Sequence, residues 1–193
     1  MFDVMVTLAV APLVAAIVGT FAVVLAFELR GNPFFVQERI GLAGRTFRMF
    51  KLRTMRHVGA GEAQPYVVDD WQTFVFSPAG FRDPRVTRWG QFCRDTSIDE
   101  LPNLLNVLLG DMSLVGPRPE ITELVEQYPA EYHRRHDVRP GIAGLAQVNG
   151  RSDLTYAEII TYDLDYVDNH SVLTDIHILW RTALVVLTGS GAR

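Results

Sequence analysis

The chain contains a single cysteine, Cys93, among its 193 residues. An internal disulfide framework is therefore excluded, and so low a cysteine content fits a reducing compartment such as the cytoplasm. With no second cysteine to share a metal, we interpret Cys93 as a small core residue.

The sequence also has no excess of basic residues, because 18 Lys and Arg are outnumbered by 22 Asp and Glu, for a net charge of −4. That balance excludes a generally basic nucleic-acid binder, although local basic patches stay open.

Two common phosphate-binding signatures are absent as well. The sequence has no Gly-x-x-x-x-Gly-Lys-Ser/Thr loop, and no Gly-x-Gly-x-x-Gly follows a predicted strand. His133 and His136 lie three residues apart but without cysteines or a His-Glu-x-x-His motif, so we interpret them as surface or phosphate-facing residues and not as zinc ligands. There are no internal repeats, and the length suits one domain of ordinary size.

Residues 4–27 form an uncharged apolar run. As a helix it would extend about 36 Å, enough to cross a hydrocarbon core. A cleaved signal peptide is disfavoured because no basic segment precedes the run. Pro12 removes a backbone donor and could turn the helix back into a re-entrant hairpin, whereas a single span with a tolerated proline is the alternative. The flanking charges do not decide between the two.

Beyond residue 31 the sequence becomes mixed in polarity. Residues 33–39 and 46–52 read as two strands joined by a glycine-containing turn, which predicts a β-hairpin. Residues 57–80 show no sustained period and are interpreted as a variable loop. Two helical patterns follow, at 155–169 and 174–187. The apolar end of the second could pack in a core or lie on a membrane interface.

Asp99 and Glu100 are adjacent carboxylates at a predicted helix start. Ser97 is a suitable N-cap, and Ser97-x-x-Glu100 fits a capping box. The helix dipole is expected to keep a carboxylate in this turn ionised, and the free N–H groups of the turn suit a phosphate. An ionised Asp beside an anion site is what phosphoryl transfer to an aspartate nucleophile needs. The alternative is that Glu100 only caps the helix and Asp99 only complements the dipole.

Arginines surround this segment in an otherwise acidic chain. Arg88 precedes it, Arg118 follows within a Pro-Arg-Pro element, and Arg139 stands before a Pro-Gly pair. Arginines held by rigid backbone suggest several phosphate contacts. Solvated surface arginine is the alternative for any one of them.

Several of these motifs, taken in order, resemble the bacterial sugar transferase family, the monotopic polyprenol-phosphate phosphoglycosyl transferases. The resemblance covers nearly the whole chain and is carried by residues 50–55, 85–90, 96–102, 106–119 and 138–151. It implies a helix-rich α/β (α+β) fold, in which a small catalytic module is attached to an N-terminal, proline-broken re-entrant membrane helix. The short β-hairpin predicted above belongs to that module.

The resemblance also implies a reaction. The family moves a sugar-1-phosphate from a UDP-sugar to polyprenol phosphate and releases UMP, the first membrane step of glycoconjugate synthesis. By the match, Asp99 is the nucleophile that forms a covalent phosphosugar intermediate, and Glu100 helps to hold Mg²⁺. Candidate phosphate contacts are Lys51, Arg88, Arg118, Arg139 and Arg151.

On this basis we expect residues 1–30 to be the re-entrant membrane helix. Residues 31–193 would be a catalytic domain on the cytoplasmic face of the bacterial inner membrane, including C-terminal interfacial helices. The expected partners are a UDP-sugar, polyprenol phosphate and membrane lipid, with no nucleic acid polymer and with a homo-oligomer left open. Two alternatives are a non-catalytic membrane adaptor and a glycosyltransferase that moves the sugar alone and releases UDP.

Overall fold

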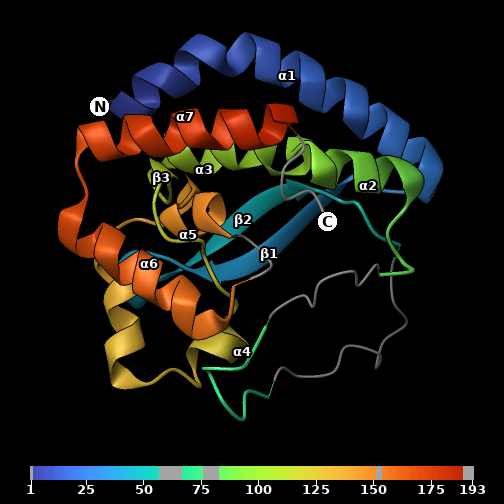
Figure 1. Ribbon diagram of the computed structural model, residues 1–193. Helices are drawn as coiled ribbons and strands as arrows, with labels where there is room; N and C mark the ends of the chain where they lie inside the picture. The colour runs from blue at the N-terminus through green and yellow to red at the C-terminus, as the bar shows by residue number, and fades with distance from the viewer. Residues whose placement is uncertain (1, 57–66, 76–82, 151–153, 189–193) are drawn as a thin grey trace.

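The computed structural model of the chain describes residues 2–56, 67–75, 83–150 and 154–188 (Figure 1). It has the helix-rich α/β composition predicted from the sequence, with two small sheets. In chain order the elements are α1 (Phe2–Leu29), β1 (Phe34–Ile40), η1 (Leu42–Gly44), β2 (Thr46–Leu52), α2 (Arg88–Asp95), η2 (Ile98–Asn103), α3 (Leu104–Leu109), β3 (Ser113–Val115), α4 (Thr122–Val125), η3 (Ala130–Asp137), β4 (Gly141–Ala143), α5 (Leu145–Asn149), α6 (Tyr156–Asn169) and α7 (Val172–Thr188).

The predicted hairpin is confirmed. Strands β1 and β2 pair antiparallel from Phe34 opposite Leu52 to Ile40 opposite Thr46. The turn between them includes Ala43 with a φ of 54°, in the left-handed region. The register places Lys51 near the open end of the hairpin, where β2 contacts η2.

A second sheet was not predicted from the sequence. Strands β3 and β4 are three residues each and pair in parallel, Ser113 with Gly141 and Val115 with Ala143. Glycine is required at the junction, because a Cβ on Gly141 would lie 2.0 Å from the backbone nitrogen of Gly116. This close approach brings the segment that contains Arg118 beside the segment that ends in β4.

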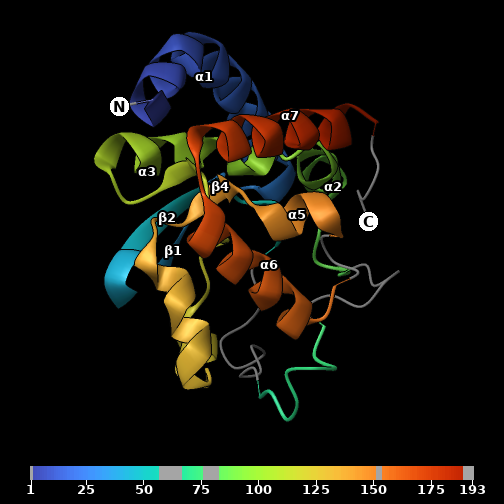
Figure 2. The ribbon, with the colours of Figure 1, turned by 60° about the vertical axis from the view of Figure 1, so that its left-hand side comes forward.

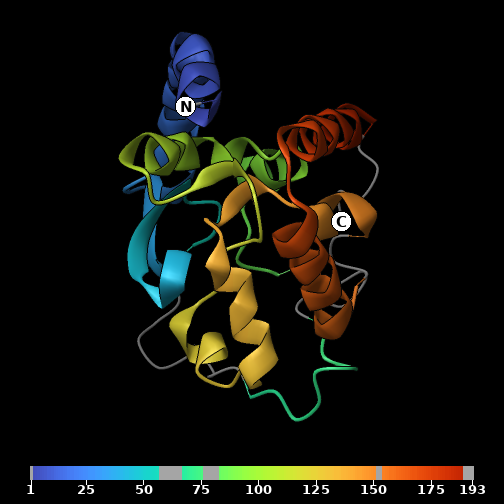
Figure 3. The ribbon, with the colours of Figure 1, turned by 90° about the vertical axis from the view of Figure 1, so that its left-hand side faces the viewer.

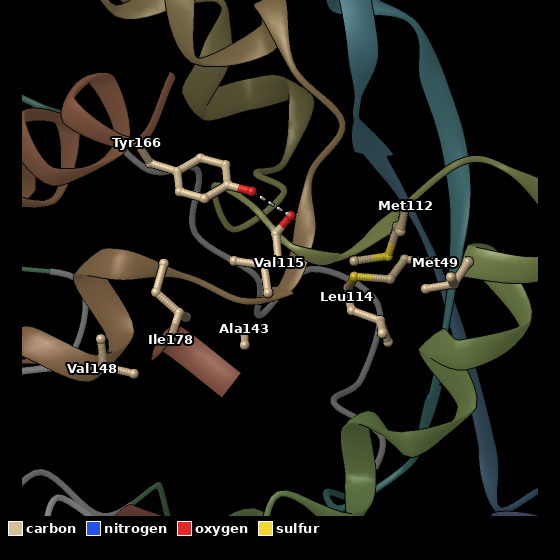
Figure 4. Close-up of a cluster of buried hydrophobic side chains, with 9 residues drawn as sticks. Met49, Met112, Leu114, Val115, Ala143, Val148, Tyr166 and Ile178 are labelled. Atoms are coloured by element: carbon tan, nitrogen blue, oxygen red, sulfur yellow. Dashed lines mark hydrogen bonds between the residues drawn. The ribbon is translucent and has the colours of Figure 1, made fainter. Parts of the chain in front are cut away.

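The main core lies between these strands and the C-terminal helices (Figure 4). Met112, Leu114 and Val115 pack there with Ile178 of α7, which is fully buried. The hydroxyl of Tyr166 in α6 donates a hydrogen bond to the Val115 carbonyl at 3.2 Å. The core therefore fixes the C-terminal helices against the strands that lead to the predicted site.

Helix α1 is apolar and largely exposed, and it lies over the rest of the molecule. Its most apolar 18-residue window has a mean hydropathy of 2.6, and only 11% of that window is buried. The helix is continuous through Pro12 and is not broken into the expected hairpin; it curves into an arch whose two ends come down toward the module (Figure 1). Asp3 accepts a hydrogen bond from Ser113 at 2.8 Å, and Glu28 accepts one from the Trp89 backbone at 3.2 Å.

Helices α1, α2, α3 and α7 form one side of the molecule, and the hairpin and α4 to α6 lie below them (Figures 2 and 3). The core alternative for the last helix is confirmed at Ile178, which is fully buried, while Trp180 on another face of α7 is 64% exposed. Large apolar side chains are exposed along this side at Trp89, Phe92, Leu105, Leu108, Leu109, Val172, Leu173, Ile176, Trp180 and Leu184. The prediction of Cys93 as a core residue is confirmed, since it is fully buried against α1.

Candidate active site

Asp99 and Glu100 lie in the first turn of a short 3₁₀ helix, η2, which leads directly into α3. The predicted capping box is wrong. Ser97 has a left-handed φ of 57° and makes no side-chain cap, and its backbone N–H bonds to the Arg94 carbonyl. Ser97 thus terminates the preceding helix α2, since a left-handed residue commonly ends a helix. The Glu100 side chain is consequently available for other partners.

Glu100 pairs with two cations that come from different parts of the chain. Its Oε1 accepts hydrogen bonds from Lys51 Nζ at 3.0 Å and from Arg118 Nη2 at 2.7 Å. Burial opposes ionisation, but the ion pairs with Arg118 and Lys51 outweigh it and hold the pKa of Glu100 well below its usual range. The interpretation of Glu100 as a simple helix cap is therefore wrong, because the carboxylate is an anchor for two cations.

The environment of Asp99 differs from the one expected. Burial, followed by the neighbouring charge of Glu100, raises the pKa of Asp99 to about 6, although Lys51, Arg118 and Arg94 lower it. The 3₁₀ helix η2 has only six residues, and partial burial raises the pKa of Asp99 instead of leaving it at the value of a surface carboxylate. At neutral pH Asp99 is still mostly ionised, and it is less strongly solvated than a surface carboxylate.

Among the described residues, neither Arg88 nor Arg139 forms an ion pair with Glu100. Arg88 is exposed at the first residue of α2, and Arg139 is exposed just before Pro140 and β4. Arg151 lies outside the described residues. Lys51 and Arg118 are thus the two predicted cations that the structure brings to Glu100.

A cavity adjoins this cluster. It is lined by Arg39, Met49, Lys51, Glu100, Asn103, Met112, Arg118, Pro119 and Gly141. Sequence reasoning missed Arg39 and Asn103. The spacing of Asn103 three residues after Glu100 was a usable signal, because side chains at i and i+3 eclipse in a 3₁₀ helix. Arg39 is paired with Glu120 at 3.5 Å, so the cations left for the single carboxylate Glu100 are Lys51 and Arg118, and this excess of one positive charge favours an anion in the cavity.

The carboxylates could form part of a magnesium site. Among the described residues there is no group of three or more His, Cys, Asp or Glu side chains that could hold a metal. Mg²⁺, however, is commonly bound by one or two carboxylates together with the phosphates of a substrate. Glu100 uses Oε1 for its two cations, so Oε2 is the atom suited to a metal. The residues present therefore fit a site that a diphosphate completes.

A second arginine network supports Arg118 from behind. Arg135 Nη2 donates to the Arg118 carbonyl at 2.8 Å and to Asp163 Oδ2 at 2.6 Å. Its Nη1 donates to the hydroxyls of Tyr128 at 2.6 Å and Tyr156 at 2.8 Å. This network was not predicted, since its members are far apart in the sequence. It fixes the backbone that carries Arg118.

The histidine interpretation is corrected in part by the same region. His136 is buried, and its ring stacks on Tyr128 with centroids 6.2 Å apart, whereas His133 is exposed. Burial lowers the pKa of His136 to about 4, so its ring is neutral at pH 7. His136 is therefore part of the aromatic packing and is not a surface residue.

Part of the predicted loop at 57–80 belongs to this packing too; residues 57–66 and 76–80 lie outside the described residues. Trp71 packs edge-on against Tyr128 and Tyr132, at centroid distances of 5.5 and 5.6 Å. The Phe74 carbonyl accepts a hydrogen bond from the Tyr156 backbone at 2.8 Å. The described middle of the loop is thus anchored to the aromatic cluster behind Arg118.

Sequence comparison decides the family. The family description of bacterial sugar transferases matches residues 1–189. The chain belongs to the bacterial sugar transferase family.

Several curated members of the family are similar to it. The chain is 37% identical over 203 residues to the exopolysaccharide production protein ExoY of Sinorhizobium fredii, covering 99% of this chain and 86% of that protein. It is 41% identical over 181 residues to the galactosyl transferase CpsE of Streptococcus agalactiae, covering 92% and 40%. Identity is 42% over 188 residues to the UDP-glucose:undecaprenyl-phosphate glucose-1-phosphate transferase of Xanthomonas campestris pv. campestris, covering 90% and 37%. The chain thus spans about 40% of the length of two of these sugar transferases.

Proposed function

We propose that this protein transfers a sugar-1-phosphate from a UDP-sugar to polyprenol phosphate. The observation that carries the proposal is the half-buried Asp99–Glu100 pair, with Lys51 and Arg118 on Glu100. Relatives named as a UDP-glucose:undecaprenyl-phosphate glucose-1-phosphate transferase and an undecaprenyl-phosphate galactose phosphotransferase support this substrate class. The relative ExoY, an exopolysaccharide production protein, supports a role in surface glycan synthesis.

In the first step a carboxylate oxygen of Asp99 attacks the β-phosphorus of the UDP-sugar. The bond from that phosphorus to the bridging oxygen breaks, and UMP leaves with the oxygen and the electron pair. In the second step a phosphate oxygen of the polyprenol phosphate attacks the same phosphorus. The bond to Asp99 breaks, which regenerates the carboxylate and yields the polyprenol-diphosphate sugar. Splitting the transfer in this way predicts ping-pong kinetics.

The neighbours of Asp99 suit these steps. Lys51 and Arg118 offset the negative charge of a diphosphate that approaches two carboxylates. Partial burial keeps Asp99 weakly hydrated while a pKa of about 6 leaves it ionised at neutral pH. Mg²⁺, held by Glu100 and the substrate, would supply further charge neutralisation at the diphosphate. Arg118 in turn is held in place by Arg135 through its carbonyl oxygen.

We further propose that α1 enters and leaves the cytoplasmic leaflet of the bacterial inner membrane on one side. Two contacts support re-entry, because Asp3 near one end and Glu28 near the other both bond to the catalytic module. A helix that crossed the hydrocarbon core, which is about 30 Å thick, would place these two residues on opposite sides of it. The module could then contact one of them but not both. The exposed apolar side chains of α2, α3 and α7 lie on the same side as α1 and suit a membrane interface (Figure 3).

The test is nucleotide release from a panel of UDP-sugars with a short polyprenol phosphate and Mg²⁺. We expect UMP as the product, and we expect Asp99→Ala to abolish its release. Asp95→Asn is the matched control, because Asp95 lies four residues earlier and accepts a hydrogen bond from Gln91 within α2. Mass spectrometry of the protein with UDP-sugar alone should find the phosphosugar on Asp99. Full activity of Asp99→Ala would overturn the proposal.

The identity of the nucleotide separates the alternatives. Release of UDP would indicate a glycosyltransferase that moves only the sugar. No nucleotide release from any UDP-sugar, by a protein that is folded and inserted in lipid, would favour a membrane adaptor. Loss of UMP release on chelation of divalent cations, restored by Mg²⁺, would support the metal.

A further inference from the structure

Two buried asparagines, Asn103 and Asn106, lie three residues apart beside the active site. Asn106 is fully buried and makes three hydrogen bonds: its Nδ2 donates to the Arg48 carbonyl at 2.7 Å and to Asp111 at 3.3 Å, and its Oδ1 accepts from the Phe50 backbone at 3.2 Å. Asn103 is only 2% exposed, yet its Oδ1 has no hydrogen-bond partner among the described residues.

An unsatisfied buried acceptor is costly, and native structures contain few of them. Asn106 shows that the same side chain, one turn later, is fully satisfied in this fold. Asn103 differs in lining the cavity with Glu100, Lys51 and Arg118. The oxygen without a partner thus belongs to a residue that lines the cavity beside Glu100, which points to a ligand as its partner.

We propose that Asn103 Oδ1 accepts a hydrogen bond from the sugar of the UDP-sugar, from a hydroxyl or an acetamido N–H. The inference rests on the proposed function of the Asp99–Glu100 site and makes Asn103 a determinant of sugar specificity.

The chemistry of the cavity favours this partner over a phosphate. A phosphate is a hydrogen-bond acceptor at neutral pH and is served by Lys51 and Arg118, two cations that line the cavity. An amide oxygen needs a donor, and the group bonded to the phosphate that Asp99 attacks is the sugar. In a 3₁₀ helix Asn103 lies on the same side as Glu100, about 6 Å further along the axis. That displacement is close to the width of one sugar ring.

The experiment compares wild type with Asn103→Ala on the UDP-sugar that gives the fastest UMP release. We expect kcat/KM to fall about two- to tenfold, the range of one buried hydrogen bond. The two proteins are then assayed with analogues of that UDP-sugar that lack one hydroxyl, or the acetamido group, at a time. For one analogue the wild-type rate should drop to that of Asn103→Ala, and the substitution should have no further effect. Equal losses from Asn103→Ala on every analogue would overturn the proposal.

A stability measurement separates ligand recognition from a structural role. Asn103→Leu removes an unsatisfied acceptor, so we expect its apparent Tm without substrate to equal or exceed that of wild type. Asn106→Leu is the matched control. It leaves the Phe50 N–H and the Arg48 carbonyl without their partner, so we expect a fall of several degrees. A comparable fall for Asn103→Leu would show that the Asn103 amide is structural and would overturn the proposal.

These outcomes are distinguishable from failure of the proposed function. If wild type releases no UMP from any UDP-sugar, the reaction is wrong, whatever Asn103 does. If wild type is active and Asn103→Ala retains the same kcat/KM and the same preference among analogues, only the inference about Asn103 fails.

Discussion

Two arginine–carboxylate pairs, Arg135–Asp163 and Arg118–Glu100, are linked by a hydrogen bond, and they differ in how far their hydrogen-bonding groups are satisfied within the protein. Arg135 and Asp163 have side chains only 1% and 2% exposed, and Arg135 donates to four groups of the protein. Arg118, paired with Glu100, has a side chain that is 43% exposed. The first pair is satisfied within the fold. The second keeps a guanidinium at a cavity with an unsatisfied amide, so the same chemistry serves structure in one place and a substrate in the other.

The buried pair also positions the exposed one. Arg135 donates a hydrogen bond to the carbonyl oxygen of Arg118, so the network around Arg135 and Asp163 fixes the backbone that carries Arg118. A charged side chain that binds a substrate is more effective on a fixed backbone, because its position relative to the reacting group is then set before the substrate binds. The buried network is accordingly expected to determine stability, and the exposed pair is expected to determine rate.

The largest effect on stability is expected from Arg135→Met. The substitution leaves Asp163 buried without its counter-ion, which typically costs about 3 to 5 kcal/mol. For a chain of this size we expect the apparent Tm to fall by about 10 °C, measured by thermal unfolding in detergent.

The double variant Arg135→Met with Asp163→Leu sharpens this test. Because both charges are removed, much of the lost stability should return. The Arg118 carbonyl still lacks its donor, so UMP release should remain slower than in wild type. Full recovery of both Tm and rate would contradict the positioning role of Arg135.

The reverse pattern is expected for Arg118→Met. Removing a preorganised cation from a phosphoryl-transfer site typically costs about 10²- to 10³-fold in rate. Its half-exposed side chain contributes little to stability, so the Tm should change by less than about 2 °C. A fall in Tm as large as that of Arg135→Met, measured in parallel, would show that the two pairs are not functionally distinct.

The pH dependence of UMP release should report Asp99. Because burial raises its pKa to about 6, the nucleophile becomes protonated below that pH, and the initial rate should fall about tenfold per pH unit there. Arg118 lowers this pKa, so Arg118→Met should move the acid limb to higher pH. Rate profiles of the two proteins between pH 5 and 8, a window set by that pKa, measure the shift, and an unchanged limb would count against the electrostatic coupling.

The same shift predicts the sign of a stability effect. The folded protein binds the Asp99 proton more tightly than the unfolded chain, whose pKa is 3.8. Stability from this group is therefore present below pH 4 and is lost as pH rises through about 6. Asp99→Asn should consequently be at least as stable as wild type at neutral pH, although inactive. Thermal unfolding of the pair at two pH values checks this, and a large loss of stability at neutral pH would contradict it.

The smallest effect is expected at the cap of α6, the helix that carries Tyr156 and Asp163. Thr155 and Glu158 form a capping box there. Thr155→Ala should cost about 1 kcal/mol and lower the Tm by about 3 °C, with UMP release unchanged. Thr161→Ala is the matched control, because Thr161 is exposed on the same helix and its hydroxyl donates to the Ala157 carbonyl, a bond within one turn of the helix. A reduced rate in Thr155→Ala would show that the active site depends on α6 more directly than proposed.

Local patterns were enough to predict much of this architecture. The hairpin expected at 33–39 and 46–52 forms at Phe34–Ile40 and Thr46–Leu52, and the last two helices form within two residues of their predicted bounds. Each of these elements is specified by periodicity and end signals within its own residues. The parallel pair β3–β4 escaped prediction, because three-residue strands paired across 25 residues leave no periodic signal.

The features of the candidate active site can likewise be separated into those that the sequence predicted and those that it did not. The sequence by itself determined that Asp99 and Glu100 are adjacent, that arginines accompany them, that an apolar N-terminal helix is present and that the family's motifs occur in order. Only the tertiary structure decided that Glu100 pairs with Lys51 and Arg118, that Arg135 supports Arg118, and that Asn103 lines the same cavity while its side-chain oxygen is unsatisfied among the described residues. The reason is that pKa values and hydrogen-bond partners depend on burial and on residues distant in the chain, which no local pattern encodes.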